Sequence, residues 1–531
     1  MIPSGGAVSE YAIGAHFEWA STAIISSLLT VGEVGSFPLH AATAYFVTLE
    51  TDTPAQTVFL STLRQNFTSE KSLISGNDFS GLSLTTGRIE LDNSEALYDA
   101  GVSAYSIDGE IVTVKVGEIT DGRADYETWY TVGEFIGVRH IADETMLAFE
   151  VRDKTYLLDV PARKSAPYAG TGNLEGGAEV AGKNKPWWLG WNYGVSAAPI
   201  LPADLIDQVN DGECEIVDCY DSAAPYDFTA DYADLPALRA ATLVPGQFAT
   251  CNALGLARRG GAAFGPVTYD VKGYDRAGNF IETTADIIEE VILGACNLDA
   301  DDLAPNTFDL MNIQQDAPRG YGFPYTSEET VTQFANKWMR GVFGYLNVDR
   351  MGKIEIALID PPGLVPAAFY DATQFLNIGR EPLPDSLFPP PRKVRVSFAH
   401  NWTRLDTVVA EVSDPARVAA LKEDYQIAST SDQDAEDIER DYPSSTTPDV
   451  VLGYFKNEED AQTEADRQFD FKIGARALYS GTIPLHPFVH DIGENIHVTK
   501  PRFELADGKI MRLLGIRNAI ETRSQEVTGL V

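Results

Sequence analysis

The chain has 531 residues, of which 78 are acidic and 40 basic, so its formal net charge is −38. This excess of acid argues against a primary binder of nucleic acid or of anionic membranes, because both need basic patches. The length suffices for about three or four domains, and 44% hydrophobic residues is typical of a globular chain. The best apolar stretch, from Thr22, meets Glu33 too early for a membrane span of about 18 residues.

The first 165 residues are predicted to be mostly β-strands. The run 105–118 alternates polar and apolar residues around Asp108-Gly109, a two-residue turn that matches the twist of paired strands. The runs 128–141 and 145–161 continue this pattern, with turn residues between them. The spacing is typical of a barrel or sandwich, so residues 1–165 are expected to form a barrel-like β domain.

A glycine-rich stretch over 170–194 has the outline of a phosphate loop. Gly177 is separated by four residues from Gly182-Lys183, which is one residue short of that motif. Asn184 stands where a Ser or Thr would hold Mg²⁺, and Pro186 with Trp187 interrupts any helix that would cradle phosphates. The looser glycine pattern at 170–176 lacks a strand–turn–helix context. We therefore interpret this stretch as a connector within a β-rich middle domain over 166–263.

The next part, 264–379, is predicted to be an α+β domain. Apolar residues at 287, 288, 291 and 292 indicate an amphipathic helix over 283–295. A second helix is predicted after a capping box formed by Thr326 and Glu329, with Trp338 on its buried face. A hairpin around 349–352 follows.

Residues 380–393 contain five prolines and are predicted to be a linker. Strands resume at Val394, a charged block covers 413–449, and a helix capped by Asn457, with Asp460 three residues on, is expected next. Strand-like alternation returns toward the end of the chain. Residues 394–531 are therefore expected to form a second barrel-like β domain with a helical insertion, and the whole chain to be mainly β with an α+β middle.

Two sets of residues are candidate metal ligands. Cys214 and Cys219 are expected to point to opposite faces of one strand, so a site would also need Cys251 and Cys296 to converge on them. The second set is His486, His490 and His497, where Pro487 excludes a helix interior and a surface loop is expected. Neither pattern is sufficient to assign a metal, and the sparse cysteines agree with synthesis in a reducing cytoplasm.

No sequence motif indicates catalysis. GxSxG, HExxH and Cys–His–Asn arrangements do not stand out, and acids are too numerous for any carboxylate pair to be chosen. We therefore assign no catalytic residue, no cofactor, no metal and no enzyme activity from the sequence.

Five segments, taken in order, resemble the baseplate or tail-tip hub proteins of long-tailed bacteriophages and related prophages. They begin at Gly87 (GRIELDNSEALYD), Tyr168 (YAGTGNLEGGAEVAGKNKP), Ile206 (IDQVNDGECEIVDCYD), Leu256 (LARRGGAAFGPVTYDVKGYD) and Val394 (VRVSFAHNW). The resemblance extends from about residue 45 to the end and lies in the order and spacing of these segments. The first segment departs from the pattern, because Ser94-Glu95 replaces an expected Asp-Gly turn.

The resemblance implies a structural virion protein that forms a homotrimer. In such hubs, one barrel-like domain from each end of the chain contributes to a ring of six modules that matches the sixfold tail tube. The middle domains then hold a central fibre or spike. The implied partners are the tail tube or distal tail protein and the fibre or spike, with DNA only in passage and the host envelope contacted indirectly. The implied location is the tail tip of the virion.

Two alternative functions remain open from the sequence. Trp187 to Trp191 (WWLGW) suggests a stacking platform for a receptor- or carbohydrate-binding adhesin, although aromatic residues in a connector more often pack against a neighbouring domain. A cell-wall hydrolase at the tail tip is the other alternative. The acidity itself has two explanations, repulsion of DNA phosphates from a channel or solvation of the outer surface.

Overall fold

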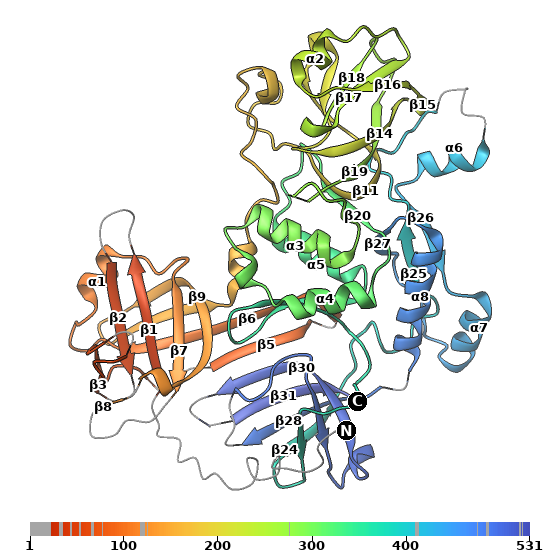
Figure 1. The fold of residues 1–531 in the computed structure, drawn as a ribbon. Coiled ribbons are helices and arrows are strands. Elements are labelled where there is room, and N and C mark those ends of the chain that lie inside the picture. Colours follow the sequence, from red (N-terminus) through yellow and green to blue (C-terminus); the bar gives the residue numbers. More distant parts are fainter. Residues whose placement is uncertain are drawn as a thin grey trace, which may run out of the picture.

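The structure is a computed structural model, and the fold it shows is mainly β, as the sequence predicts. It describes residues 23–30, 36–42, 45–52, 55–64, 68–76, 78–116, 123–124, 126–275, 277–408, 414–474, 476–484, 488–519, 522 and 524–531. Figure 1 shows a β-rich lobe at each end of the chain, a third β-rich lobe at the top, and helices α3 (Thr284–Ala295), α4 (Pro305–Gln314) and α5 (Val331–Arg340) in the centre.

The largest sheet has 15 strands and contains both ends of the chain. Its main path runs in the order β2 (Ser36–Ala42), β1 (Ala23–Thr30), β7 (Ile111–Val116), β9 (Tyr130–Ala142), β10 (Met146–Arg152), β6 (Asp78–Asp92), β5 (Thr68–Ser75), β30 (Lys509–Ala519), β31 (Ser524–Leu530), β28 (Leu478–Pro484) and β24 (Leu376–Glu381). Four strands join it off this path: β21 (Gly344–Val348), β22 (Ile354–Leu358), β23 (Ala368–Tyr370) and β29 (Asn495–Val498). Among the described strands the order is an open path and closes no barrel.

The pairing of β5 with β30 joins the two ends of the chain. The strands are antiparallel, and their register runs from Thr68 opposite Ala519 to Ser72 opposite Gly515. The two β-rich ends are therefore parts of one continuous sheet, and hydrogen bonds of the sheet connect them directly.

The lobe at the top of Figure 1 is built from two five-stranded sheets. The first has the order β15 (Ala224–Pro225), β14 (Cys214–Asp221), β19 (Val267–Gly273), β11 (Trp187–Val195) and β20 (Gly320–Phe323). The second has the order β12 (Ala198–Leu201), β13 (Ile206–Gln208), β18 (Leu256–Arg259), β17 (Gln247–Cys251) and β16 (Asp227–Asp231), with α2 (Leu235–Ala240) beside it.

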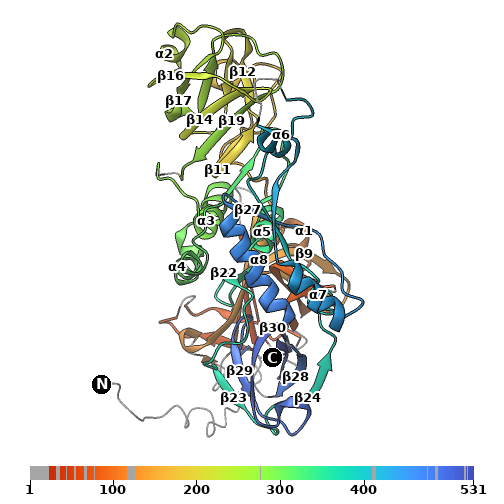
Figure 2. The same cartoon turned by 90° about the vertical axis from the view of Figure 1, so that its right-hand side faces the viewer.

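The remaining elements cover the centre and the N-terminal lobe. They are the sheet of β26 (Gln426–Ser429), β25 (Arg395–Phe398) and β27 (Val451–Phe455), the sheet of β4 (Val58–Phe59), β3 (Phe46–Thr48) and β8 (Arg123–Ala124), and the helices α1 (Asp99–Ala104), α6 (Pro415–Lys422), α7 (Asp432–Asp441) and α8 (Glu458–Ile473). Short 3-10 turns occur at Tyr126–Thr128, Lys154–Leu158, Asn173–Glu175, Pro202–Asp204, Asn252–Leu254, Ala300–Asp302 and Phe503–Leu505. In Figure 2, α8 descends from the central helices toward the C-terminal strands.

The predicted helices are present, but the cap of α5 was placed wrongly. Helix α5 begins at Val331, and its capping box is formed by Thr330 and Gln333 instead of Thr326 and Glu329. The Glu329 carboxylate is bonded to the Tyr321 hydroxyl and the Lys337 ammonium, which leaves it outside the helix. The spacing of a capping box occurs twice here, and only the second copy adjoins the apolar run.

Other helix predictions are confirmed. Trp338 of α5 is fully buried, and its indole N–H donates to the Thr284 carbonyl at 3.0 Å. Helix α3 has Thr283 as its N-cap, and the Thr283 side chain accepts from the Asp286 N–H. Helix α8 follows Asn457 as predicted, but the predicted cap is wrong: the Asn457 amide donates to the Asp460 carboxylate, and its side chain accepts from no backbone N–H of the helix.

The proline-rich stretch 380–393 packs against the fold. Its first residues complete β24, and Leu387 is buried in the core beneath the C-terminal strands. Pro390 and Pro391 are buried as well. The division of the chain into domains at this stretch stays a prediction.

Candidate functional site

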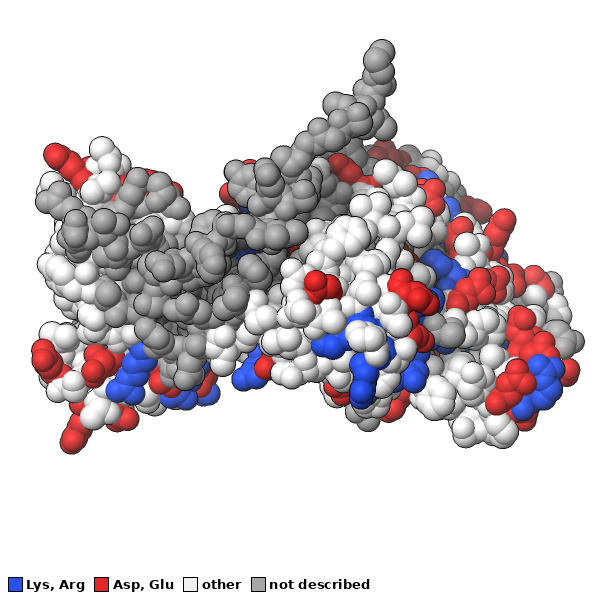
Figure 3. All heavy atoms as spheres, turned by 90° about the horizontal axis from the view of Figure 1, so that it is seen from below, with Lys and Arg blue, Asp and Glu red and all other residues white. Residues whose placement is uncertain are grey.

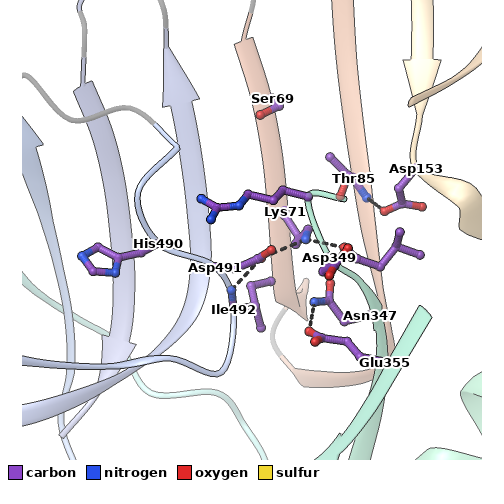
Figure 4. A network of polar contacts seen from close by, with 12 residues as sticks. Ser69, Lys71, Thr85, Asp153, Asn347, Asp349, Glu355, His490, Asp491 and Ile492 are labelled. Carbon is purple, nitrogen blue, oxygen red and sulfur yellow. Dashed lines mark hydrogen bonds and ion pairs between the residues drawn. The ribbon is translucent and has the colours of Figure 1, made fainter. Parts of the chain in front are cut away.

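A polar junction lies where the N-terminal strands, the hairpin β21–β22 and the C-terminal strands meet (Figure 4). Its centre is Lys71 on β5, which is buried although it carries a charge. The Lys71 ammonium donates to the Val348 carbonyl at 2.6 Å and to Asp491 Oδ1 at 2.9 Å. One side chain thus connects three parts of the sequence. The residues of this polar junction are Ser69, Lys71, Thr85, Asp153, Asn347, Glu355, His490, Asp491, Asn518 and Gln525.

Two further carboxylates extend the polar junction. Glu355 on β22 accepts from the Asn347 amide at 2.5 Å, and burial raises the pKa of the Glu355 carboxyl. Asp153 lies at the end of β10 and accepts from the Thr85 N–H of β6 at 2.6 Å. These contacts fix the hairpin and the N-terminal strands beside Lys71.

An amide network holds the C-terminal side of the polar junction. Asn518 on β30 donates to Ser69 Oγ on β5 at 3.3 Å and accepts from the Phe488 N–H at 3.0 Å. Gln525 on β31 donates to Asn518 Oδ1 at 2.9 Å and to the His490 carbonyl at 2.8 Å. The network is satisfied internally, and the cavity beside it has a volume of only 40 Å³. This geometry is suited to fastening the two ends of the chain together and leaves little room for a substrate.

The cysteines are placed differently from the sequence prediction. Cys214 and Cys219 are both fully buried on β14, so they share one face of that strand. A β-bulge between Ile216 and Asp218 inserts one extra residue and shifts the alternation, which the prediction of opposite faces did not anticipate. Burial raises the pKa of both thiols.

The other two cysteines lie in different clusters. Cys251 packs in the core around β17, and Cys296 at the end of α3 packs in the central core. All four cysteines are free thiols. Among the described residues, no group of three or more His, Cys, Asp and Glu side chains is arranged to hold a metal ion.

The histidines do not form a described cluster. His486 lies outside the described residues. His490 is buried instead of lying at the surface, and its ring bonds the Tyr370 hydroxyl at 2.6 Å and Glu494 at 2.7 Å. His497 on β29 lies against the Phe369 ring. In Figure 4 the His490 ring points away from Lys71 and Asp491.

The aromatic platform suggested by residues 187–191 is mostly inside the protein. Trp187 and Trp188 have no exposed surface. Trp191 is half-buried, and the ammonium groups of Lys456 and Lys272 lie 3.9 Å and 4.8 Å from its ring centre. The two leading tryptophans therefore have no face available for stacking on a sugar.

The residues that resemble a phosphate loop contact other parts of the protein. Lys183 lies over the Tyr325 ring at 5.3 Å, and the Asn184 amide donates to the Ser327 carbonyl at 2.7 Å. The sequence leads into strand β11 and not into a helix. The connector interpretation of this stretch agrees with these contacts.

Charges on the exposed face of the large sheet are arranged in pairs of opposite sign. Arg139 bonds Glu150 across β9 and β10 at 2.5 Å, and Arg517 bonds Glu526 across β30 and β31 at 3.2 Å. The view from below in Figure 3 likewise shows Lys and Arg mixed with Asp and Glu over the described surface. The described helices also include none that is long and apolar enough to cross a membrane.

Comparison with known proteins returns structural matches only. A scan against protein-family models gives no match, and neither does a search of curated protein sequences. Three of the similar solved structures are a 43 kDa tail protein of prophage MuSo2 from Shewanella oneidensis, a tail protein from Neisseria meningitidis MC58 and the virion of a native gene transfer agent particle. The chain resembles phage and prophage tail proteins.

The extent of this likeness is as follows. The Shewanella protein is 9% identical with a TM-score of 0.37, and the match covers 96% of this chain and 98% of that one. The Neisseria protein is 11% identical with a TM-score of 0.35, and the match covers 96% of each chain. The gene transfer agent chain is 12% identical with a TM-score of 0.38, and the match covers 66% of this chain and 84% of that one.

Sequence reasoning singled out only His490 of the polar junction, as a candidate metal ligand, and missed its central residue Lys71. Lys71 lies in the run TSEKSLIS, where its alternation with Ser69 and Leu73 marks it as inward-facing. A lysine on the buried face of a strand is a signal for a buried charge pair, because such a charge needs a partner. Its partner Asp491 is far away in the sequence and carries no comparable signal.

Proposed function

We propose that this chain is a structural protein of a phage tail and forms the trimeric hub of the tail tip or baseplate. In this proposal it joins the sixfold tail tube to a threefold central fibre or spike and surrounds the channel through which DNA passes. The chain acts by assembly and not by catalysis. It is made in the host cytoplasm and resides in the virion.

The continuous sheet is the observation that supports this proposal most directly. A hub must hold its tube-facing modules in a fixed relation, because errors in their angle would accumulate around the ring. Here the β5–β30 pairing and the Lys71–Asp491 ion pair at 2.9 Å fix the N-terminal strands to the C-terminal strands. The order of sequence segments that resembles tail hubs is independent support.

The neighbours follow from the same proposal. The two β-rich ends would face the tail tube or distal tail protein, and the central and upper lobes would face the fibre or spike. DNA would be contacted only in passage, and the host envelope only through other tail proteins.

The two alternative functions gain no support from the described geometry. An adhesin built on residues 187–191 would need exposed tryptophans, and Trp187 and Trp188 are buried. For a hydrolase, the carboxylates Asp78, Asp385 and Asp449 line a described cleft, but no histidine accompanies them in that lining and Asp78 is ion-paired with Arg340.

The test is the mass of the purified chain combined with the composition of the particle. Native mass spectrometry should give a species of three times 57.8 kDa, and negative-stain images should show a threefold ring. Antibody against the chain should label one end of the particle in electron micrographs. A monomer at micromolar concentration, with no labelling of particles, would contradict the proposal.

A further inference from the structure

A cleft of 680 Å³ lies between the proline-rich stretch and helices α5 and α8. Six segments of the chain form its walls: 78–80 on β6, 333–344 with α5, Ile359 after β22, 385–395, 446–452 and the end of α8. The apolar part of the lining includes the side chains of Phe79, Phe343, Ile359, Val394 and Leu452. Polar junction residues are absent from the described lining, so this cleft is a separate feature.

Hydrogen-bond donors in this cleft exceed the acceptors that the protein provides for them. Lys472 is 8% exposed, and its ammonium has one described hydrogen bond, to the Gln468 amide oxygen at 3.5 Å, and lies 5.0 Å from the centre of the Phe343 ring. Among the described residues, no carboxylate lies within ion-pair distance of Lys472. Arg395 Nε and Ser386 Oγ are buried with no hydrogen-bond partner in the described protein. A buried donor without an acceptor is costly, so these groups favour a ligand that brings oxygen atoms.

The charge of the lining agrees with an anionic ligand. The lining has four basic side chains, Lys337, Arg340, Arg395 and Lys472, and three acidic ones, Asp78, Asp385 and Asp449. The whole chain has about two acids for every base, so the cleft is unusually basic for this protein. Asp385 and Asp449 are exposed, and so are Lys337 and Arg340, which are ion-paired with Glu329 and Asp78. Lys472 is the charged residue of the described lining that is buried.

We propose that this cleft binds a carboxylate-bearing segment of a partner polypeptide, with Lys472 and Arg395 donating to its carboxylate oxygens. The apolar lining would cover aliphatic parts of the same segment. The cleft volume is within the range of about 300–1,000 Å³ typical of ligand sites and far exceeds a lone acetate or phosphate. The choice of a polypeptide rests on the proposed assembly function.

The experiment measures binding of a defined acidic peptide to the purified full-length chain. The probe is a fluorescein-labelled hexapeptide of alternating Glu and Leu, and its matched control has Gln in place of each Glu. Fluorescence anisotropy should show saturable binding of the Glu peptide and at least tenfold weaker binding of the Gln peptide. Absence of saturable binding, or equal binding of both peptides, would overturn the proposal.

Two substitutions locate the site. Lys472→Met keeps the length of the side chain without its charge and should weaken the Glu peptide at least tenfold. Lys422→Met removes an exposed charge of α6 and should leave binding unchanged. Arg395→Gln provides a second variant with an expected weakening of several-fold. Equal affinities for the wild-type chain, Lys472→Met and Arg395→Gln would place the peptide elsewhere and overturn the proposal.

Small anions are the remaining comparison. Sodium acetate and inorganic phosphate should displace the Glu peptide only at concentrations far above that of the peptide. Displacement by either anion at peptide-like concentrations would show a small-anion site and overturn the polypeptide assignment. The binding assay uses the isolated chain, so a failure to bind the peptide does not affect the particle-labelling test of the hub proposal. A failure of particle labelling likewise does not affect the binding assay.

Discussion

At the scale of single residues, the structure contains several buried charges that are compensated in different ways. Lys71 has an ion pair and a carbonyl. Arg319, fully buried and stacked 3.5 Å from the Trp338 ring centre, has only neutral acceptors: the Gly453 and Trp338 carbonyls and the Thr284 hydroxyl. Lys472 has the weakest compensation of the three. Charges of this kind contribute to specificity more than to stability, since an apolar replacement of a whole pair is often neutral.

Substitution of Lys71 by Met should destabilise the fold. Loss of the ammonium leaves the Asp491 carboxylate, 19% exposed, and the Val348 carbonyl without their shared donor. We expect a loss of about 3–5 kcal/mol in the free energy of unfolding, measured by urea denaturation. The double substitution Lys71→Met and Asp491→Asn should recover part of the lost free energy of unfolding, because it leaves no unpaired carboxylate at position 491.

The control for this prediction is Arg139→Gln. Arg139 is exposed and pairs with Glu150 on the surface, so its loss should change stability by no more than about 1 kcal/mol. Equal effects of the Arg139 and Lys71 substitutions would show that the Lys71 pair is solvated.

Lys472 provides a prediction about pH. Burial lowers the pKa of Lys472 to about 8. The nearby carboxylates of Asp78 and Glu464 raise this pKa, whereas the guanidinium groups of Arg467 and Arg340 lower it further. The unfolded side chain has a pKa of about 10.4, so between these values the unfolded chain binds more protons and stability rises with pH. Lys472→Met cannot titrate there. It should melt above the wild-type chain at pH 7, and the difference should shrink toward pH 10.

The same melting curves separate this explanation from another. A difference between Lys472→Met and the wild-type chain that stays constant from pH 7 to 10 would contradict a buried, titrating ammonium. One pKa unit corresponds to about 1.4 kcal/mol, so the expected change is measurable by calorimetry.

At the scale of elements, short sequence patterns predicted the helices and hairpins whose formation depends on neighbouring residues in the chain. The apolar spacing of α3 was sufficient to locate that helix, because this spacing is confined to a few turns. The hairpin β21–β22 followed from Asp349 and Gly352, where Gly352 adopts a positive φ of 75°. The bulge in β14 has no such signal, since it is set by pairing with β19, and this is why Cys214 and Cys219 were assigned to opposite faces.

The pairing of β5 with β30 was also beyond sequence reasoning. Ser69 and Asn518 bond across a separation of 449 residues, and strands of ordinary composition carry no mark of a distant partner. The same holds for the cleft around Lys472, whose walls come from six segments. Composition predicted strands at both ends of the chain, and tertiary packing alone placed them in one sheet.

Helix α5 allows the two possible capping boxes to be compared. Thr330→Ala should lower the free energy of unfolding by about 0.5–2 kcal/mol, because the Gln333 N–H loses its acceptor at 3.3 Å. Thr326→Ala should have little effect, since Thr326 precedes the helix. Trp338→Ala, by contrast, should lose about 3–5 kcal/mol from a fully buried site. The order of these three effects in chemical denaturation checks the observed helix start, and a larger effect at Thr326 than at Thr330 would contradict it.

At the scale of the whole molecule, the net charge of −38 has to be reconciled with a sheet face whose charges are paired. The pairs Arg139–Glu150 and Arg517–Glu526 neutralise that face locally. Part of the surplus of acid lies in α7, where Asp and Glu outnumber the single Arg440. A large net charge of one sign favours solubility.

The last prediction concerns the unity of the two chain ends. If residues 1–165 formed an independent barrel, a chain cut after Pro391 would keep its N-terminal strands intact. The structure instead gives β5 hydrogen bonds to β30, and Lys71 a charge partner in Asp491, both of which the cut removes. An orphaned edge strand with a buried, unpaired ammonium should open readily, because edge groups and charges both need compensation. Hydrogen–deuterium exchange of 68–75 should therefore accelerate by at least tenfold in the truncated chain. The control is a chain from which residues 1–35 are deleted. It keeps β5 and β30 paired, so the exchange of 68–75 should be unchanged. Protection of 68–75 that survives the cut after Pro391 would show that the N-terminal strands fold alone, and that the continuous sheet is a junction between two independent units.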